Sequence, residues 1–336
     1  LGTGLVGSFV AKRLAINGHL VYAYDIAPNI QLIGHKNITI VEGDALEIIV
    51  DVNKMPKFDL IVNMLPGDIG HDAMKILCAQ NVKVVDLSFS EITPDSLIKE
   101  NKNKNSTVLW DVGIAPGLSN MLVSQAFREF GKLDTVSIKV GGNPSEPDNE
   151  WSYMAPFSPH DVIAEYTRPA RIIANGKISE VPAMTELHSI DANGRGMEAF
   201  LTDGLRSLLD TPAKSMGEYT VRWPGHIQKY QQSNLNPDEL VDAWKMDSSK
   251  EEFTWMEIHI ISGNNEKRWI IEDSGMGGDS SMARTTGLVT ACCALEWIKQ
   301  PDMLGSGVHA PERLSNAVIE SIIDVMRSEG VSIELQ

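Results

Sequence analysis

The sequence opens on a glycine-rich turn, Gly2-Thr3-Gly4-Leu5-Val6-Gly7, and this turn restricts the possible fold more than any other feature of the chain. Apolar side chains recur at helical spacing directly after the turn, and Asn17-Gly18 ends that predicted helix. An alternating run at residues 20–24 then predicts a strand. With Leu1 as the last residue of a preceding strand, the order is strand, turn, helix, strand, which opens a dinucleotide-binding α/β domain.

Each glycine of the turn has a predicted role. Gly2 permits the tight turn, Gly4 lets a pyrophosphate approach the backbone, and Gly7 lets the helix lie close to the sheet. Asp25 ends the second strand, where its carboxylate can accept hydrogen bonds from both ribose hydroxyls and would repel a 2'-phosphate. These residues predict NAD as the cofactor, and the helix amides expected to face its phosphates include those of Leu5 and Val6. The alternative is a glycine turn in an unrelated α/β protein, with Asp25 as a helix cap.

Further β-rich runs follow at residues 38–41, 58–63, 82–86 and 107–110, with helical segments between several of them. This pattern predicts a Rossmann-type, doubly wound parallel sheet, in which ligands bind beyond the carboxyl ends of the strands. The residues near those ends that we expect at the cofactor are Asp44, Asn63, Leu65, Pro66, Asp86, Leu87, Gly113 and Pro116. Each of them can equally be a turn or cap residue, which is the commoner role of Asp, Asn and Pro at strand ends.

Composition excludes several classes of partner. A formal net charge of −16, without a block of Lys or Arg, argues against nucleic acid as a partner. No apolar stretch approaches the roughly 20 residues that cross a bilayer, and no export signal precedes the first domain, so we expect a cytoplasmic protein without a membrane segment. Cys78, Cys292 and Cys293 lack the spacing of a zinc site, so we expect buried thiols and no metal.

The second half of the chain has a different pattern. The predicted strands there are residues 134–140, 171–174, 183–190, 253–261 and 267–272. An Asn175-Gly176 step favours a tight hairpin, and residues 202–209 and 237–244 are predicted as helices. We expect an α+β domain with a mixed sheet, and an exposed sheet face of such a domain commonly forms a homodimer.

The predicted division into domains follows from this change of pattern. Residues 1–120 and 282–336 are expected to form the NAD-binding domain. Residues 121–281 are expected to bind the substrate and to dimerise.

The loop Asp111-Val-Gly-Ile-Ala-Pro-Gly-Leu-Ser-Asn120 resembles the Gly-x-x-Pro-Gly loop of the saccharopine dehydrogenase superfamily. Three further blocks resemble that superfamily in the same order: residues 204–208, 220–226 and 282–287. Saccharopine reductases typically have Asp and Tyr where this sequence has Ala115 and Phe89. Without those polar groups, the loop looks more like that of L-lysine 6-dehydrogenases.

This resemblance implies an enzyme with NAD and a small amino-acid substrate. The implied reaction oxidises the ε-amine of L-lysine to an imine, which hydrolyses to the 6-semialdehyde and then cyclises. The alternatives within the superfamily are a saccharopine dehydrogenase and a carboxynorspermidine dehydrogenase. A non-catalytic NAD-binding scaffold is the alternative of a different class.

Five residues are candidates for the chemistry. Arg222 is expected to grip the substrate α-carboxylate, since a guanidinium forms two parallel bonds to a carboxylate. Asp86 is expected to take the amine proton, and His226 to relay a proton or bind the substrate. Glu165 and Tyr166 resemble a Glu-Tyr region of the superfamily and are expected to face the substrate. The structural alternatives are a surface arginine, a helix cap at Asp86 and a structural histidine.

Arg284, Thr285 and Thr286 come last among the candidates. Their amides or hydroxyls can reach a ligand, but Ser281 and Thr285 can also simply start a helix.

Overall fold

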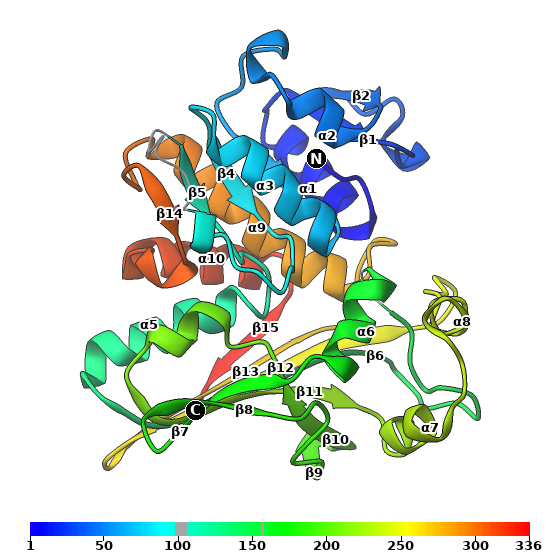
Figure 1. The fold of residues 1–336 in the computed structure, drawn as a ribbon, viewed down its shortest axis with the longest axis vertical. Helices are drawn as coiled ribbons and strands as arrows, with labels where there is room; N and C mark the ends of the chain where they lie inside the picture. Colours follow the sequence, from blue (N-terminus) through cyan, green and yellow to red (C-terminus); the bar gives the residue numbers. More distant parts are fainter. Residues whose placement is uncertain (98–105, 156–157) are drawn as a thin grey trace. The chain divides into compact units, whose positions relative to one another are not determined.

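The computed structural model describes residues 1–97, 106–155 and 158–336 (Figure 1), and the chain divides into two units. The first unit comprises Leu1–Leu118 and Thr286–Val325. The second comprises Ser119–Thr285 and Met326–Gln336. Within the described ranges, no helix is long and apolar enough to cross a membrane.

The strands of the first unit are parallel wherever they pair. One pair joins β1 (Val21–Asp25) to β2 (Ile38–Glu42). The other set has the order β14 (Gly307–His309), β5 (Thr107–Leu109), β4 (Lys83–Asp86), β3 (Ile61–Asn63). β14 was not predicted, because three residues carry too little alternation to be recognised.

Leu1 and Gly2 connect these two sets of strands. The amino group of Leu1 donates to the carbonyl of Val62 at 2.7 Å, and the Met64 amide donates to the Leu1 carbonyl at 2.9 Å. On the other side, the Gly2 amide donates to the Tyr24 carbonyl at 2.9 Å. The order is therefore β2, β1, residues 1–2, β3, β4, β5, β14, and the predicted Rossmann-type parallel sheet is confirmed.

The inner strands of this unit are apolar on both faces. Val84, Val85, Val108 and Leu109 have no exposed surface, as expected for parallel strands covered by helices on either side. The α-helices that contribute to the unit are α1 (Leu5–Ile16), α2 (Ala45–Ile49), α3 (Gly67–Cys78), α9 (Ser281–Lys299) and α10 (Asn316–Ser328). Its single-turn helices are η1 (Ile30–Leu32), η2 (Val52–Lys54) and η4 (Pro311–Arg313).

The second unit is built on one mixed sheet, which confirms the predicted fold class. Its strands in spatial order are β15 (Ser332–Leu335), β13 (Asn265–Asp273), β12 (Glu252–Ser262), β6 (Leu133–Pro144), β11 (Ala213–Arg222), β10 (Arg195–Thr202) and β9 (His188–Ala192). β6 and β11 are parallel, and the other pairs are antiparallel. The predicted hairpin at Asn175-Gly176 joins β7 (Ala170–Ala174) to β8 (Lys177–Val181), and β7 also pairs with β11.

The helices of this unit are short except for α5. They are α5 (Leu118–Phe130), α6 (Pro159–Thr167), η3 (Arg206–Asp210), α7 (His226–Gln232) and α8 (Pro237–Ala243). α8 begins at a capping box, in which Asn236 and Glu239 each bind the other's backbone amide.

Three details of the prediction were wrong. The predicted helix at residues 202–209 is a strand end followed by η3, because Thr202 pairs with Glu218 of β11. Residues 183–187 are not in a strand, and β9 begins at His188. The last residues of the chain were expected in the first unit, but Ile333 pairs with Ile271, and β15 lies along β13 at the edge of the second sheet (Figure 1). Strand pairing decides the first and the third of these, and local propensity does not report it.

Candidate functional site

The glycine turn has the geometry of a phosphate-binding loop. Gly2 has φ +85°, and a Cβ there would lie 2.7 Å from the Met64 carbonyl oxygen, while a Cβ at Gly7 would lie 2.2 Å from the Gly2 carbonyl oxygen. A Cβ at Gly4 would meet nothing within 4 Å. Packing therefore requires the outer two glycines, and the exposed middle one leaves open space beside the backbone. The residues present fit a bound dinucleotide.

Two further features of the turn agree with that fit. The first bond of the α1 ladder runs from the Ser8 amide to the Gly4 carbonyl, so the amides of residues 5–7 lie outside the ladder at an uncapped N-terminus. Asp25 accepts from the Thr3 amide at 2.5 Å, from the Thr3 hydroxyl at 3.0 Å and from the Ala27 amide at 2.9 Å. Its carboxylate therefore lies against the turn.

Asn63 and Asp86 lie side by side at the carboxyl ends of β3 and β4, where they are register partners. Asn63 Nδ2 donates to Asp86 Oδ1 at 2.7 Å and to the Gly70 carbonyl at 3.0 Å. The Ser88 hydroxyl contacts both carboxyl oxygens of Asp86, at 2.9 and 3.1 Å. Burial raises the pKa of Asp86 to about 7, since the bonds from Ser88 and Asn63 lower it less and the nearby Asp111 raises it further.

The other predicted cofactor residues occupy turns and caps of the same unit. Asp44 is the N-cap of α2, with its Oδ1 accepting from the Leu46 amide at 2.8 Å. Pro66 is the exposed N-cap of α3, Leu65 precedes it half-buried, and the amide of half-buried Leu87 donates to the Asn63 carbonyl at 2.8 Å.

The Pro-Gly loop is a closed turn. The Gly113 amide donates to the Pro116 carbonyl at 3.0 Å, and the Leu118 amide donates to the Gly113 carbonyl at 2.9 Å. A Cβ at Gly113 would lie 3.0 Å from Leu87 Cδ1 and 3.1 Å from the Pro116 carbonyl oxygen, so the space beside this glycine is tight. Ala115 and Pro116 are half-buried in the loop.

The second unit contains a buried cluster around Arg222, the last residue of β11. Arg222 Nε donates to the Tyr166 hydroxyl at 2.9 Å, and Nη1 donates to the Val221 carbonyl at 3.0 Å. Nη2 donates to Glu165 Oε2 at 2.9 Å and to the Tyr153 hydroxyl at 3.3 Å. Arg222 is only 3% exposed, so it is not a surface arginine.

His226 completes this cluster through Tyr166. Its Nδ1 lies 2.9 Å from the Trp151 carbonyl and its Nε2 lies 3.0 Å from the Tyr166 hydroxyl. A carbonyl only accepts, so Nδ1 carries the hydrogen and Nε2 accepts from Tyr166, which in turn accepts from Arg222. Burial, and then the charge of Arg222, lowers the pKa of His226 to about 3. The imidazole is therefore neutral near pH 7.

Two members of the cluster were missed in the sequence. Tyr153 lies under the Arg222 guanidinium, with 4.2 Å from Cζ to the ring centre, and Trp151 accepts the bond from His226. The rings of Trp151, Tyr153 and Trp244 surround the imidazole at 5.9, 5.1 and 5.6 Å between centres. The signal available was the pair of aromatic residues in Trp151-Ser-Tyr153, shortly before the helix that carries Glu165 and Tyr166.

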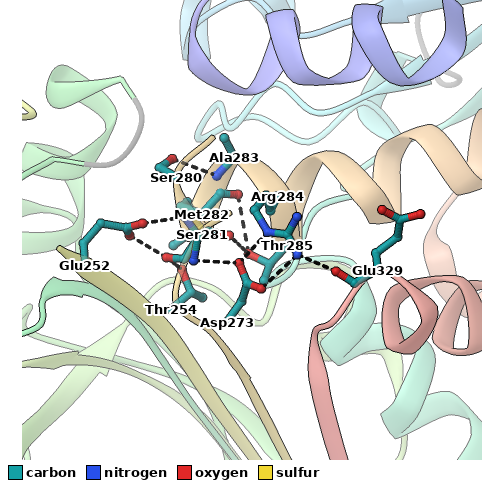
Figure 2. A network of polar contacts seen from close by, with 11 residues as sticks. Glu252, Thr254, Asp273, Ser280, Ser281, Met282, Ala283, Arg284, Thr285 and Glu329 are labelled. Atoms are coloured by element: carbon teal, nitrogen blue, oxygen red, sulfur yellow. Dashed lines mark hydrogen bonds and ion pairs between the residues drawn. The ribbon is translucent and has the colours of Figure 1, made fainter. Parts of the chain in front are cut away.

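The block at residues 282–287 is occupied by structural contacts at the start of α9 (Figure 2). Arg284 forms a bidentate pair with Asp273, at 2.9 Å from Nε and 3.1 Å from Nη2, and the Ser281 amide donates to Glu252 at 2.5 Å. The Thr285 hydroxyl donates to the Ser281 carbonyl at 2.8 Å. Ser281 and Arg284 therefore hold the first turn of the helix on β12 and β13, while the Thr285 bond lies within the helix. Among the described residues, no group of three or more metal-binding side chains occurs.

These observations define a class: a two-unit α/β protein with a Rossmann-type unit and a mixed-sheet unit. The family described as "Saccharopine dehydrogenase C-terminal domain" matches residues 113–331. The chain belongs to the saccharopine dehydrogenase family, and the predicted resemblance is confirmed at that level.

Curated relatives are similar at low identity. The mitochondrial alpha-aminoadipic semialdehyde synthase of Rattus norvegicus is 25% identical over 196 residues, which is 54% of this chain and 21% of the relative. The NADP(+), L-glutamate-forming saccharopine dehydrogenase of Pyricularia oryzae is 24% identical over 134 residues, which is 38% of this chain and 30% of the relative. The matches thus span less than a third of these relatives.

A solved structure matches over the whole length. The apo saccharopine dehydrogenase (L-Glu forming) from Saccharomyces cerevisiae has a TM-score of 0.74 and 16% identity, and the match covers 100% of this chain and 98% of that chain. At this identity the match shows a shared fold.

Proposed function

We propose that this chain is an NAD-dependent dehydrogenase that oxidises the ε-amine of L-lysine to an imine, which water converts to the 6-semialdehyde and ammonia. One observation carries the proposal: Asp86 is a fully buried carboxyl group whose hydrogen-bond partners are the neutral side chains of Asn63 and Ser88, and burial raises its pKa to about 7. Amine oxidation at neutral pH needs such a group, because hydride leaves a carbon next to a neutral amine, and the ammonium must first lose a proton.

The proposed roles follow the two units. The first unit binds the dinucleotide through the glycine turn and Asp25, and NAD supplies the acceptor for the hydride of the substrate carbon. Asp86 takes the proton of the substrate ammonium and later releases it to water. The second unit binds the amino-acid end of the substrate at the Arg222 cluster, and its sheet joins a homodimer, which light scattering can test.

Two features support lysine over saccharopine as the substrate. Ala115 and Phe89 replace the Asp and Tyr that a second dicarboxylate arm is expected to need. Asp25 supports NAD over NADP, because its carboxylate would repel a 2'-phosphate.

Saccharopine oxidation is the second candidate function. The observations in its favour are that the Pyricularia relative and the yeast structure are both named as L-glutamate-forming saccharopine dehydrogenases, and that the relative is named as using NADP. The two candidates differ in substrate, while the proton acceptor is the same.

A substrate screen separates these candidates. The purified protein is assayed with NAD and with NADP, against L-lysine, saccharopine and carboxynorspermidine, by absorbance of the reduced cofactor. We expect turnover of L-lysine with NAD. Turnover of saccharopine without turnover of L-lysine would overturn the proposal in favour of the second candidate, and no turnover of any amine together with NAD binding would indicate the scaffold.

A further inference from the structure

We propose that Glu165 recognises the non-reacting ammonium group of the substrate, and that Arg222 is a positioning residue that holds Glu165 instead of gripping a substrate carboxylate. This inference rests on the proposed function, because it concerns the amino-acid end of the same substrate. It assigns the specificity of the site to a carboxylate, and it reverses the role that the sequence suggests for Arg222.

Both edges of the Arg222 guanidinium already carry hydrogen bonds. A guanidinium grips a carboxylate with two parallel N–H donors on one edge. On one edge, Nε and Nη2 already bind Tyr166 and Glu165. On the other, Nη1 and Nη2 bind the Val221 carbonyl and the Tyr153 hydroxyl. A substrate carboxylate would have to displace two buried partners to form a bidentate pair.

In the described part of the chain, both hydrogen bonds to the Glu165 side chain use the same carboxyl oxygen. Its Oε2 accepts from Arg222 Nη2 at 2.9 Å and from the Thr220 hydroxyl at 3.5 Å. Its Oε1 accepts no hydrogen bond from the part of the chain that the structure describes, and the side chain is 18% exposed. A carboxylate oxygen is an acceptor only, so the atom left available fits an N–H donor.

The charges of the groups around Glu165 also favour an ammonium. Tyr166 and His226 are neutral near pH 7, because burial raises the pKa of the tyrosine and lowers that of the histidine. Arg222 and Glu165 therefore balance one another within the cluster. Burial also raises the pKa of Glu165, and Arg222 opposes that shift only in part. An ammonium at Oε1 would further oppose the rise in the pKa of Glu165 and stabilise its charged form, whereas a carboxylate there would be repelled.

The ligand class follows from these contacts and charges. The site should bind substrates that keep a primary ammonium at the end that does not react, which L-lysine and 1,5-diaminopentane have and 6-aminohexanoate lacks. The oxidised amine itself must be neutral during hydride transfer, so it is not the group at Glu165.

The test compares these three amines in the wild-type protein and in Glu165→Gln. For L-lysine and 1,5-diaminopentane, we expect KM to rise about tenfold or more, as for loss of a hydrogen bond to a charged group, with kcat changed less than about threefold. For 6-aminohexanoate, we expect KM to stay constant or fall, because the variant leaves the Arg222 charge uncompensated. Glu180→Gln, the same change on an exposed residue of β8, is the matched control.

Two outcomes would overturn the inference: an unchanged KM for L-lysine, or an equal rise in KM for all three amines. If Glu165→Gln fails to fold, Glu165→Asp keeps the charge and should show the same order of effects at smaller size. Calorimetric binding of the three amines is measured in parallel. If no amine is turned over, the proposed function fails, while loss of L-lysine binding in Glu165→Gln but not in Glu180→Gln would still support the role of Glu165.

Discussion

The two units bury polar groups in different ways. In the first unit, Asp86 lies among the neutral donors Asn63 and Ser88, and its pKa rises to about 7. In the second unit, Arg222 is equally buried, but a carboxylate faces it. Burial shifts the pKa of a titratable group in the direction that favours its neutral form, unless a nearby opposite charge stabilises the charged form. We therefore expect the group that gains or loses a proton near pH 7 in the first unit, and side chains whose charge stays fixed near that pH in the second.

The largest expected effect comes from removing the Arg222 charge that compensates Glu165 in the second unit. Arg222→Met leaves Glu165 buried without a cation and removes the donor to Tyr166. We expect a loss of about 3–5 kcal/mol in the free energy of unfolding, as for breaking a buried ion pair from one side. Urea denaturation at pH 7 measures it.

The control for this loss is another arginine pair in the same unit. Arg171 binds Asp203 in a bidentate pair, but its side chain is 31% exposed, so Arg171→Met should cost less. Adding Glu165→Gln to Arg222→Met should restore part of the stability, because it removes the uncompensated carboxylate. Equal losses in the two arginine variants would contradict the comparison.

The next effect concerns Asp86. Asp86→Asn should reduce kcat by about 10²–10⁴-fold, the range for loss of a general base, and remove the rise of kcat/KM through about pH 7. Rate profiles from pH 5.5 to 9 with the amine substrate measure both, with Asp72→Asn on the exposed side of α3 as the control. A wild-type pH profile in Asp86→Asn would exclude Asp86 as the proton acceptor.

The raised pKa of Asp86 also predicts how the stability of the protein changes with pH. Its pKa is raised on folding, so the stability it contributes is complete below about pH 4 and is lost as pH rises through 7. Asp86→Asn should remove that decline in urea denaturation.

The smallest expected effect concerns His226 in the Arg222 cluster of the second unit. His226 has a lowered pKa in the folded protein, so its contribution is complete above about pH 6.5 and is lost as pH falls toward 3. Between pH 6 and 4.5, this histidine should account for roughly 1 kcal/mol of lost stability per pH unit. His226→Gln should remove that share of the slope in urea denaturation, and an unchanged slope would mean that the imidazole becomes charged inside the cluster.

Local patterns predicted most of the first unit. The glycine turn, Asp25 and the strand ends are short-range features, and the parallel sheet places the carboxyl ends of its strands together. That is why Asn63 and Asp86 were predicted to lie in one place, although the pKa of Asp86 follows from burial and not from its position in the sequence.

The second unit was less predictable for a physical reason. The sequence singled out Arg222, Glu165 and His226, but what each of them binds depends on how β11, α6 and α7 pack. Arg222 is 57 residues from Glu165 along the chain, and His226 is 60 residues from Tyr166. β10 and β11 were missed as strands, since pairing and not propensity makes them.

The sequence by itself determined the glycine turn, the parallel sheet and the family, because these depend on residue type at fixed spacing along the chain. The tertiary structure decided which atoms of the predicted residues are already bonded. Among the described residues, it bonds four donors of Arg222 to neighbours, leaves Oε1 of Glu165 without a hydrogen bond and places Asp86 among neutral donors. Hydrogen-bond saturation and desolvation arise from neighbours brought together by folding, and no local pattern encodes them.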